Sequence, residues 1–203
     1  MDTPDFSFEK NSPYQPVCGI DEAGRGPWAG PVVASAVVLN PENIPDGLND
    51  SKKLTAKRRD ILFDAIIGTA MVGIGCASVE EIDEFNILNA TYLAMCRAVE
   101  DLPTPPHYAL IDGNRIPPYM SCDAEAIVKG DGRSLSIAAA SIVAKVTRDR
   151  LMVALAQQFP GYGWERNAGY GVKAHQEGLD RLGVTPHHRV SFKPIHKMLY
   201  QDN

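Results

Sequence analysis

The chain has 203 residues, of which 44% are hydrophobic and 22% are charged. A chain of this length can bury a substantial core as one domain with a modest extension, and this composition excludes a disordered or fibrous protein. No apolar run is long enough to span a bilayer, and the polar residues 1–16 lack a signal-peptide core, so we expect no membrane association. We expect residues 1–16 to form a flexible tail.

Cysteine usage and charge narrow the setting further. The four cysteines include no CxxC pair, which favours free thiols and a reducing cytoplasm. The net charge of −5 conceals an asymmetry, because residues 1–128 carry 9 basic against 19 acidic side chains whereas residues 129–197 carry 11 against 5. The basic last third can follow a phosphate backbone; alternatively, the bias only solvates helix faces.

Strand and helix signals alternate from the start of the chain. Two apolar runs, residues 17–22 and 30–39, predict strands joined by a Gly-rich turn, and strands this close in sequence favour a hairpin. Thr55 can cap a helix over residues 55–67, whose apolar residues have helical spacing. A third strand is predicted at residues 71–77.

The second half of the chain continues the alternation. Ser78 and Glu81 form a capping-box pattern that opens a helix, which residues 86–99 extend or restart. Later elements are predicted as strands at 108–112 and 124–128 and as helices at 134–159 and 173–182. Three early strands followed by strand-helix units indicate an α/β domain in which helices flank a mixed sheet.

Acidic residues stand at the ends of the predicted strands. Asp21 and Glu22 close the first strand, Asp112 closes the fourth, and Asp131 follows the fifth. Charged carboxylates are costly to bury unless they are paired or bound to a cation, and their oxygens are ligands that Mg²⁺ and Mn²⁺ prefer. Four converging carboxylates would hold two such ions for phosphoryl chemistry.

Each acid also has a purely structural interpretation. Asp112 can form an Asx turn with the following Gly113, and Asp131 can cap the next helix. Adjacent strand residues point to opposite faces, so Asp21 and Glu22 share a site only if the strand ends or bulges there. The acids alone therefore leave both a two-metal enzyme and ordinary turns open.

Motifs spread over residues 17–194 resemble those of bacterial ribonuclease HII, and they follow the family's order. The matching blocks are GIDEAGRGP at 19–27, GPVVASA at 30–36, DSKKL at 50–54, NILNAT at 86–91, IDGN at 111–114, KGD at 129–131, IAAASIVAKVTRD at 137–149, GYG at 169–171 with His175, and TPHHRVSF at 185–192. So many separate agreements make the resemblance specific.

The resemblance implies a ribonuclease H-like fold with a C-terminal helical extension. It divides the chain into the tail (1–16), a catalytic domain (17–160), and a substrate-contacting loop and helical extension (161–203) packed on the same domain. It also implies a metal-dependent endonuclease that cuts 5′ of a ribonucleotide in RNA-DNA/DNA junctions and RNA/DNA hybrids, leaving 3′-hydroxyl and 5′-phosphate ends. Its role would be ribonucleotide excision and RNA primer removal, with two Mg²⁺ or Mn²⁺ ions. The sequence offers no clear dimer surface, so a monomer is expected by default.

Motif positions carry residue roles over from the family. The metal-binding and catalytic residues would be Asp21, Glu22, Asp112 and Asp131. The substrate contacts would be Gly24, Arg25, Gly26, Ser51, Lys52, Lys53, Tyr170 and Arg189. Glycine backbone can approach the 2′-hydroxyl that distinguishes RNA from DNA, and Tyr170 would lie against the next sugar.

Other basic residues would extend the phosphate contacts, namely Lys145, Arg148, Arg150 and Lys193. A solvated turn at Lys52 and Lys53 and an ordinary loop tyrosine are the structural alternatives. The chain departs from many relatives at Asn167 and Ala168, where a His-Lys pair commonly precedes the Gly-Tyr-Gly motif.

Two other classes fit parts of the pattern. Ribonuclease HIII shares the scaffold, but its glycine motif lacks the arginine and it carries an extra N-terminal domain, whereas 16 residues precede the first predicted strand here. A catalytically inert nucleic-acid-binding module would be favoured by the loss of an acid, and all four acids are present.

Overall fold

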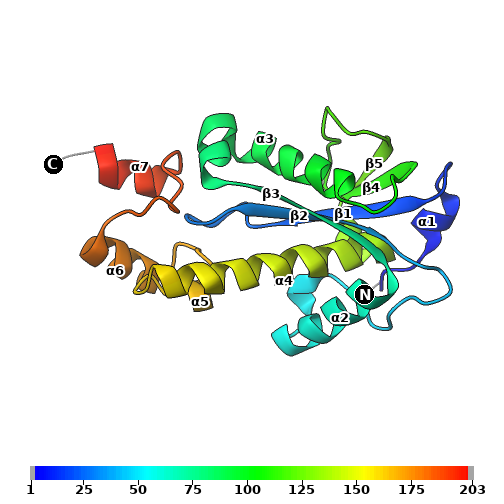
Figure 1. The fold of residues 1–203 in the computed structure, drawn as a ribbon, viewed down its shortest axis with the longest axis horizontal. Helices are drawn as coiled ribbons and strands as arrows, with labels where there is room; N and C mark the ends of the chain where they lie inside the picture. Colours follow the sequence, from blue (N-terminus) through cyan, green and yellow to red (C-terminus); the bar gives the residue numbers. More distant parts are fainter. Residues whose placement is uncertain (1–2, 201–203) are drawn as a thin grey trace.

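The computed structural model describes residues 3–200, which form one five-stranded mixed sheet with flanking helices (Figure 1). The strands are β1 (Val17–Ala23), β2 (Val32–Val38), β3 (Met71–Ala77), β4 (Tyr108–Asp112) and β5 (Asp123–Ile127), and their spatial order is β3-β2-β1-β4-β5. β1 pairs antiparallel with β2 and parallel with β4, and β4 pairs parallel with β5. The predicted hairpin and mixed sheet are confirmed.

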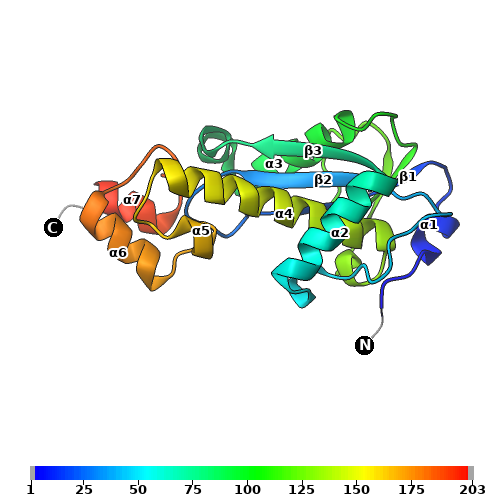
Figure 2. The same cartoon turned by 60° about the horizontal axis from the view of Figure 1, so that its bottom comes forward.

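Helices cover both faces of the sheet, as an α/β fold requires. α3 (Val79–Glu100) lies on one face, and α4 (Leu135–Gln158) lies on the other together with α2 (Ala56–Thr69) (Figures 1 and 2). Thr55 and Ser78 cap α2 and α3 as predicted. Asn86 interrupts α3 at a φ of 66°, and its side chain accepts hydrogen bonds from Leu88 N and Asn89 N, so the helix restarts there.

α4 lies very close to β1. A Cβ added at Gly19 would lie 2.1 Å from the backbone carbon of Ser136, so only glycine fits beside the first turn of α4. The small residues Ala138, Ala139 and Ala140 are fully buried against the sheet. This close approach fixes the start of α4 next to the strand end that carries Asp21.

The C-terminal helical extension forms one end of the molecule (Figure 2). It consists of α5 (Trp164–Asn167), α6 (Lys173–Leu182) and α7 (Lys193–Tyr200). A separate apolar cluster holds it to the loop after β1 and to α4: Ala29, Met152, Tyr162, Trp164, Leu179 and Ile195. The predicted extension is confirmed; its boundary at residue 160 stays a prediction, and residues 201–203 lie outside the described residues.

The expected flexible tail is wrong for residues 3–16, which pack on the domain. They include α1 (Ser7–Asn11), and Asp5 pairs through its backbone with Arg133 and Leu135. The buried Glu9 carboxylate accepts hydrogen bonds from Ser134 Oγ at 2.6 Å and Ser136 N at 2.8 Å. A carboxylate is stabilised at the N-terminus of a helix, here the start of α4. Glu9 therefore anchors this polar segment, which has no apolar run of its own that would predict packing.

Within residues 3–200, no helix combines the length and the apolar character that crossing a membrane requires.

Candidate active site

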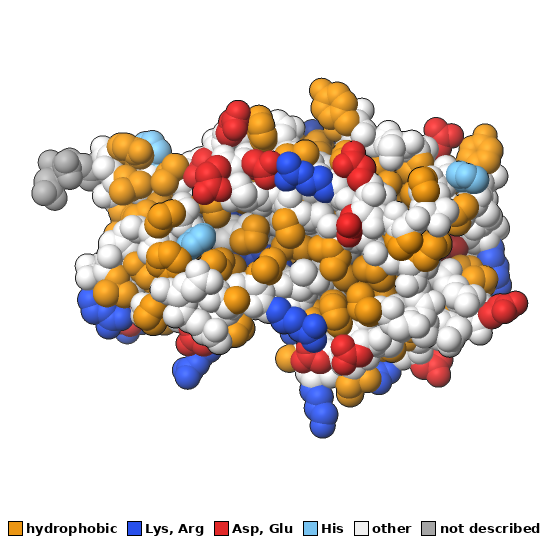
Figure 3. Space-filling model, viewed as in Figure 1, with side chains coloured by type: hydrophobic (Ala, Val, Ile, Leu, Met, Phe, Trp, Pro, Cys, Tyr) orange, Lys and Arg blue, Asp and Glu red, His pale blue; other side chains and the backbone are white. Residues whose placement is uncertain are grey.

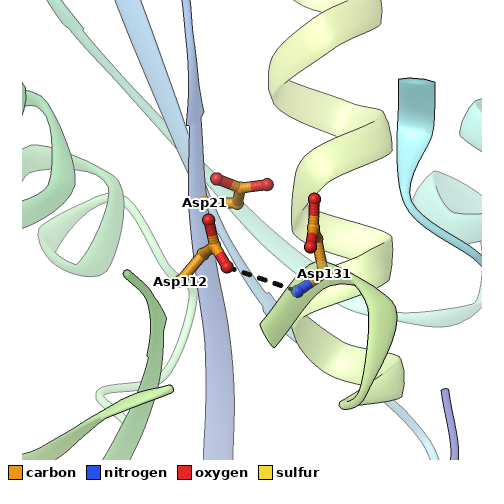
Figure 4. Close-up of side chains that lie close together, drawn as sticks. All are labelled: Asp21, Asp112 and Asp131. Carbon is orange, nitrogen blue, oxygen red and sulfur yellow. Dashed lines mark hydrogen bonds between the residues drawn. The ribbon is translucent and has the colours of Figure 1, made fainter. Parts of the chain in front are cut away.

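Three of the predicted acids converge beside the C-terminal ends of two central strands of the sheet, β1 and β4. Asp21 is near the end of β1 and Asp112 ends the neighbouring parallel strand β4, with Ile20 opposite Ile111 in the register. Asp131 lies in a short 3₁₀ helix, η2 (Gly130–Gly132), between β5 and α4. One carboxylate oxygen from each of the three lies within 4.8 Å of those of the other two (Figure 4).

Hydrogen bonds position these acids in the way a ligand set requires. Asp112 Oδ1 accepts from Gly130 N at 2.7 Å and from Asp131 N at 3.4 Å, so it ties β4 to the η2 turn rather than forming an Asx turn (Figure 4). Ser134, not Asp131, caps α4 through Ile137 N. Neither structural alternative from the sequence accounts for the placement of these carboxylates.

Glu22 lies beside the three aspartates and outside their cluster. β1 continues to Ala23, so Asp21 and Glu22 leave the strand in opposite directions. The Glu22 carboxylate accepts a hydrogen bond from Arg25 Nη1 at 3.3 Å, which also forms an ion pair. The structure therefore brings together three of the four predicted ligands and places the fourth next to them, paired with an arginine.

The carboxylates crowd one another. Burial and the charges of Glu22 and Asp112 raise the pKa of Asp21 well above 3.8. Burial also raises the pKa of Glu22, although Arg25 opposes the shift, and burial with the charge of Asp112 raises that of Asp131. Burial opposes the charge of Lys52, but Asp21 and Asp131 outweigh it and raise the pKa of Lys52, whose Nζ lies 3.7 Å from Asp131 Oδ2.

This donor set fits a hard divalent cation. It supplies only carboxylate oxygens, which suit Mg²⁺ and Mn²⁺. Burial and the neighbouring carboxylates raise the pKa values of Asp21 and Asp131, and a bound cation would favour their ionised forms. Asp21, Asp112 and Asp131 are the residues that could hold an ion, with Glu22 adjacent.

Gly24, Arg25 and Gly26 form the loop predicted to contact the sugar of the substrate, which we call the reading loop. This loop lines a pocket of about 360 Å³ beside the acids, the reading pocket. Its lining includes Asp21, Glu22, Gly24, Arg25, Gly26, Ser51, Lys52, Lys145, Arg148 and Tyr170. The Tyr170 side chain is close to Gly26, since a Cβ there would lie 3.4 Å from Tyr170 Cε1, and Tyr170 is 47% exposed. The structure therefore places the Gly24-Arg25-Gly26 loop, Tyr170 and Lys52 around one opening.

Ser51 and Lys53 lie at the margin of this opening. Ser51 is buried in the 3₁₀ helix η1 (Ser51–Lys53) and receives Ser141 Oγ at 2.7 Å, so its hydroxyl is engaged with α4. Lys53 Nζ lies near Gly132, next to Asp131. Of the two predicted lysines, Lys52 is the one that faces the pocket.

Arg189 is a correction to the predicted substrate contacts. Its side chain is fully buried and donates to the carbonyl oxygens of Gly24 (2.6 Å), Arg25 (3.0 Å) and Gly30 (2.9 Å), so direct contact with a phosphate is ruled out as the chain is folded. Burial, with the nearby charge of Arg148, lowers the pKa of Arg189 to about 9. Arg189 holds the reading loop from inside.

Arg148 also supports the reading loop from inside, so the prediction that it extends the phosphate contacts is wrong. It is 1% exposed and donates to the carbonyls of Ala29, Pro31 and Ala168. Gly24 has a φ of +100°, and a Cβ there would overlap Arg148 Nε at 2.0 Å, so glycine is required. Arg148 thus joins the reading loop to the segment that carries Tyr170, and we call Arg148 and Arg189 the arginine clamp.

The position of Arg148 could have been found from the sequence. Buried residues of α4 recur at helical spacing as Ser141, Ala144, Arg148 and Met152, so the arginine lies on the stripe that faces the core. A charged residue on such a stripe must find hydrogen-bond partners within the protein. For Arg189, in an irregular segment, no comparable periodic signal exists.

A buried histidine pair supports the Tyr170 segment. His175 Nδ1 lies 3.0 Å from the Tyr170 carbonyl, so this nitrogen carries the proton and Nε2 accepts from Trp164 Nε1 and from His188 Nε2. His188 Nδ1 in turn accepts from Thr185 N at 3.0 Å. Every position in this network requires neutral histidines, and burial lowers the pKa of both, that of His188 to about 4.

The unusual Asn167 also has a structural task. Its side chain donates to the Tyr162 carbonyl at 2.8 Å and accepts from Gly169 N at 2.9 Å, which shapes the turn before Tyr170. The neighbouring Ala168 carbonyl accepts from Arg148 Nη1 at 2.9 Å. This local network occupies the two positions where the resemblance to the family led us to expect a His-Lys pair.

The predicted basic track is discontinuous. Lys145 pairs with Asp149 at 2.7 Å, and Arg150 pairs with Asp60 at 3.4 Å. On the face in Figure 3, lysine and arginine side chains are separated by acidic and apolar groups. Lys145 lines the pocket and stays a proposed contact, Lys193 lies apart on α7, and Arg150 is engaged with α2.

The mixed sheet of order β3-β2-β1-β4-β5, with three aspartates gathered beside the ends of β1 and β4, belongs to the ribonuclease H-like class of folds. The family model for Ribonuclease HII matches residues 18–197. The Ribonuclease HII of Ruegeria pomeroyi is 63% identical over 205 residues, covering 100% of this chain and 88% of that protein. The chain belongs to the ribonuclease HII family and is a ribonuclease H endonuclease.

Solved structures agree on the fold. The crystal structure of ribonuclease H2 from Pyrococcus horikoshii superposes with a TM-score of 0.75 at 28% identity, covering 92% of this chain and 99% of that one. A Bst-RNase HIII crystal structure in complex with Mn²⁺ has a TM-score of 0.72 at 20% identity and covers 90% of this chain but 68% of that one. The second likeness concerns the fold alone.

Proposed function

We propose that this ribonuclease H hydrolyses the phosphodiester on the 5′ side of a ribonucleotide in RNA-DNA/DNA junctions and RNA/DNA hybrids. The products are a 3′-hydroxyl and a 5′-phosphate. The observation that carries the proposal is the position of three carboxylates, within 4.8 Å of one another, beside a pocket lined by Gly24, Arg25, Gly26 and Tyr170. This arrangement supports a proposed cutting centre beside a proposed sugar-reading loop.

The four acids Asp21, Glu22, Asp112 and Asp131 are proposed to hold two Mg²⁺ or Mn²⁺ ions. Two bound ions would activate a water molecule and stabilise the leaving oxygen of an in-line displacement. The chain itself contributes the fixed positions of the oxygens, because Asp112 is tied to the η2 turn and Asp21 accepts from Glu22 N at 2.7 Å.

Recognition is proposed to rest on backbone groups that the arginine clamp holds still. The carbonyl oxygens of Gly24 and Arg25 accept hydrogen bonds from the buried Arg189, and Gly24, Arg25 and Gly26 line the pocket. A rigid backbone can distinguish a 2′-hydroxyl from hydrogen at little entropic cost. Tyr170, half exposed beside Gly26, is proposed to lie against the following sugar.

Lys52 is proposed to contact a backbone phosphate, with weaker contributions from Lys53 and Lys145. Ser51 and Arg189 act indirectly, by holding η1 and the reading loop in place. We propose a monomeric, cytoplasmic enzyme with roles in ribonucleotide excision and RNA primer removal, and the free cysteines at positions 18, 76, 96 and 122 suit a reducing compartment.

The experiment compares the wild type with Asp21→Asn on duplex DNA that contains one ribonucleotide, with Mg²⁺ or Mn²⁺. We expect the wild type to cut 5′ of the ribonucleotide and the variant to be inactive. Asp64→Asn, which changes an exposed acid on α2, is the matched control and should cut normally. Cutting by Asp21→Asn, or no cutting by the wild type, would contradict the proposal; binding without cutting by the wild type would favour an inert module.

A further inference from the structure

A second pocket opens on the α3 side of the acids. It has a volume of about 310 Å³ and is lined by Glu22, Arg25, Leu88, Thr91, Tyr92, Met95, Asp112, Gly113, Asn114 and Arg115. The reading pocket described above lies on the α4 side and shares with it only Glu22 and Arg25. The acid cluster therefore stands between two pockets, and we call the second one the α3-side pocket.

The chemistry of the α3-side pocket suits an anionic chain. Asn114 and Arg115 follow Asp112 in sequence and are exposed, and within residues 3–200 the Arg115 side chain forms no hydrogen bond or ion pair. This contrasts with Lys145 and Arg150, which pair with Asp149 and Asp60. Arg115 thus offers a free guanidinium in the loop after β4, the strand next to the one that leads into the reading loop.

The pocket is unsuited to a free anion close to the acids. Glu22 and Asp112 line the edge that it shares with the cluster and would repel a phosphate there. Asn114 and Arg115 follow Asp112 in the loop after β4 and line the same pocket, so their donors can contact a phosphate other than the one that lies over the acids. A strand of nucleic acid carries a phosphate at every nucleotide and can supply both.

The direction of the strand follows from the proposed function, on which this inference rests. The cut lies 5′ of the ribonucleotide, and the ribose and the next sugar occupy the reading pocket beside Gly24 and Tyr170. Hence the reading pocket holds the 3′ side of the cut strand, and the scissile phosphate lies over the acids. The α3-side pocket is then left for the 5′ side.

We infer that the α3-side pocket binds the nucleotide on the 5′ side of the cut, and that Arg115 contacts a phosphate of that upstream segment. Arg115 is then a specificity-determining contact for strand position, because duplexes whose cut strand continues on the 5′ side of the ribonucleotide bind more tightly. Asn114 can donate or accept beside it, and Leu88, Tyr92 and Met95 of α3 line the apolar side of the pocket.

The test uses duplexes with one ribonucleotide in which a single phosphate of the cut strand is replaced by an uncharged methylphosphonate. The replacement is placed at each of the first few phosphates on the 5′ side of the cut, and at matched positions on the 3′ side. Cleavage by the wild type, Arg115→Ala and Lys10→Ala is measured, and binding is measured with Ca²⁺ in place of Mg²⁺. Lys10, exposed on α1, is the matched control.

We expect Arg115→Ala to weaken binding by about 5–10-fold and to reduce the slope of log K against log salt by about 0.9, the share of one phosphate contact. One upstream methylphosphonate should weaken binding to the wild type by a similar factor and leave binding to Arg115→Ala almost unchanged. Methylphosphonates on the 3′ side should affect both proteins alike. Lys10→Ala should match the wild type throughout.

The inference is overturned if every upstream replacement weakens the wild type and Arg115→Ala equally, or if the coupled position lies on the 3′ side. Failure of the proposed function looks different, because the wild type would then cut none of the duplexes or would cut them away from the ribonucleotide. The binding measurements still decide the role of Arg115 in that case.

Discussion

Removing one carboxylate from the acid cluster should stabilise the protein when no metal is bound. We consider Asp21→Asn, which keeps the Oδ1 acceptor for Glu22 N and removes only the charge. The cluster holds carboxylate oxygens within 4.8 Å of one another, and burial together with the charges of Glu22 and Asp112 raises the pKa of Asp21 well above 3.8. The folded state therefore bears a repulsion that the unfolded chain lacks.

The distance sets the magnitude. Two unit charges 4.8 Å apart repel by about 3 kcal/mol at an effective dielectric constant of about 20. Partial protonation of the cluster and the nearby Lys52 reduce the net effect, so we expect Asp21→Asn to stabilise the metal-free fold by about 1–2 kcal/mol. For a domain of this size that raises the Tm by roughly 2–8 °C.

The sign of the pH dependence follows from the raised pKa. Well below pH 3.8 the Asp21 carboxyl is protonated in both the folded and the unfolded state, so it adds no charge repulsion to the folded state. As pH rises through 3.8 towards the folded pKa, the unfolded state ionises first and the wild type loses stability. The advantage of Asp21→Asn should therefore grow with pH and level off above the folded pKa.

Thermal unfolding in EDTA, with and without added Mn²⁺, measures both effects. Mn²⁺ should raise the Tm of the wild type much more than that of Asp21→Asn, because the ion supplies the missing positive charge. Asp64→Asn should follow the wild type in both conditions. Equal Tm values for the wild type and Asp21→Asn in EDTA, or equal gains from Mn²⁺, would refute the electrostatic reasoning.

Three further predictions concern recognition. Arg189→Lys should lower the free energy of unfolding by about 3 kcal/mol, because an ammonium cannot serve the carbonyls of Gly24, Arg25 and Gly30 together, while the gain in Tm from Mn²⁺ should persist; denaturant titration measures the first and thermal unfolding the second. Tyr170→Ala should reduce cutting at a single ribonucleotide more than cutting within a long RNA tract, and equal losses in kcat/KM on the two substrates would count against junction reading. Between pH 6.5 and about 4 the wild type should lose about 2 kcal/mol of stability that His188→Gln does not lose, since the lowered pKa of His188 makes its contribution complete above 6.5 and diminishing as pH falls towards 4. Urea titrations of both proteins across that pH range test this prediction. Equal losses of stability in the wild type and His188→Gln would show that His188 is not responsible.

Local sequence signals were sufficient for most of the secondary structure. Thr55, Ser78 and the alternating apolar runs correctly located α2, α3 and the strands, because caps and periodicity act within a few residues. Each of these features depends on neighbours in sequence.

The interactions that support the candidate site escaped prediction because their partners are distant in sequence. Arg189 lies 165 residues from Gly24, and Glu9 lies 125 residues from Ser134. Motif position marked Arg189 as important but could not distinguish a guanidinium facing substrate from one facing carbonyl groups. Polarity marked residues 1–16 as a tail, although a single buried carboxylate at a helix N-terminus is enough to hold such a segment.

The same limitation explains the Asp21-Glu22 pair. Strand alternation argues against adjacent acids sharing one face, and β1 does alternate there. However, the acids lie where β1 and β4 end, with one pocket on each side of them. Asp21 lines the reading pocket, Asp112 lines the α3-side pocket, and Glu22 lines both. A nucleic-acid strand that crosses the ends of β1 and β4 would meet carboxylates from both pockets, and these are the residues that would hold the two proposed ions. Alternation therefore favours the proposed two-ion arrangement, and Glu22→Gln should weaken it without removing the three-aspartate cluster.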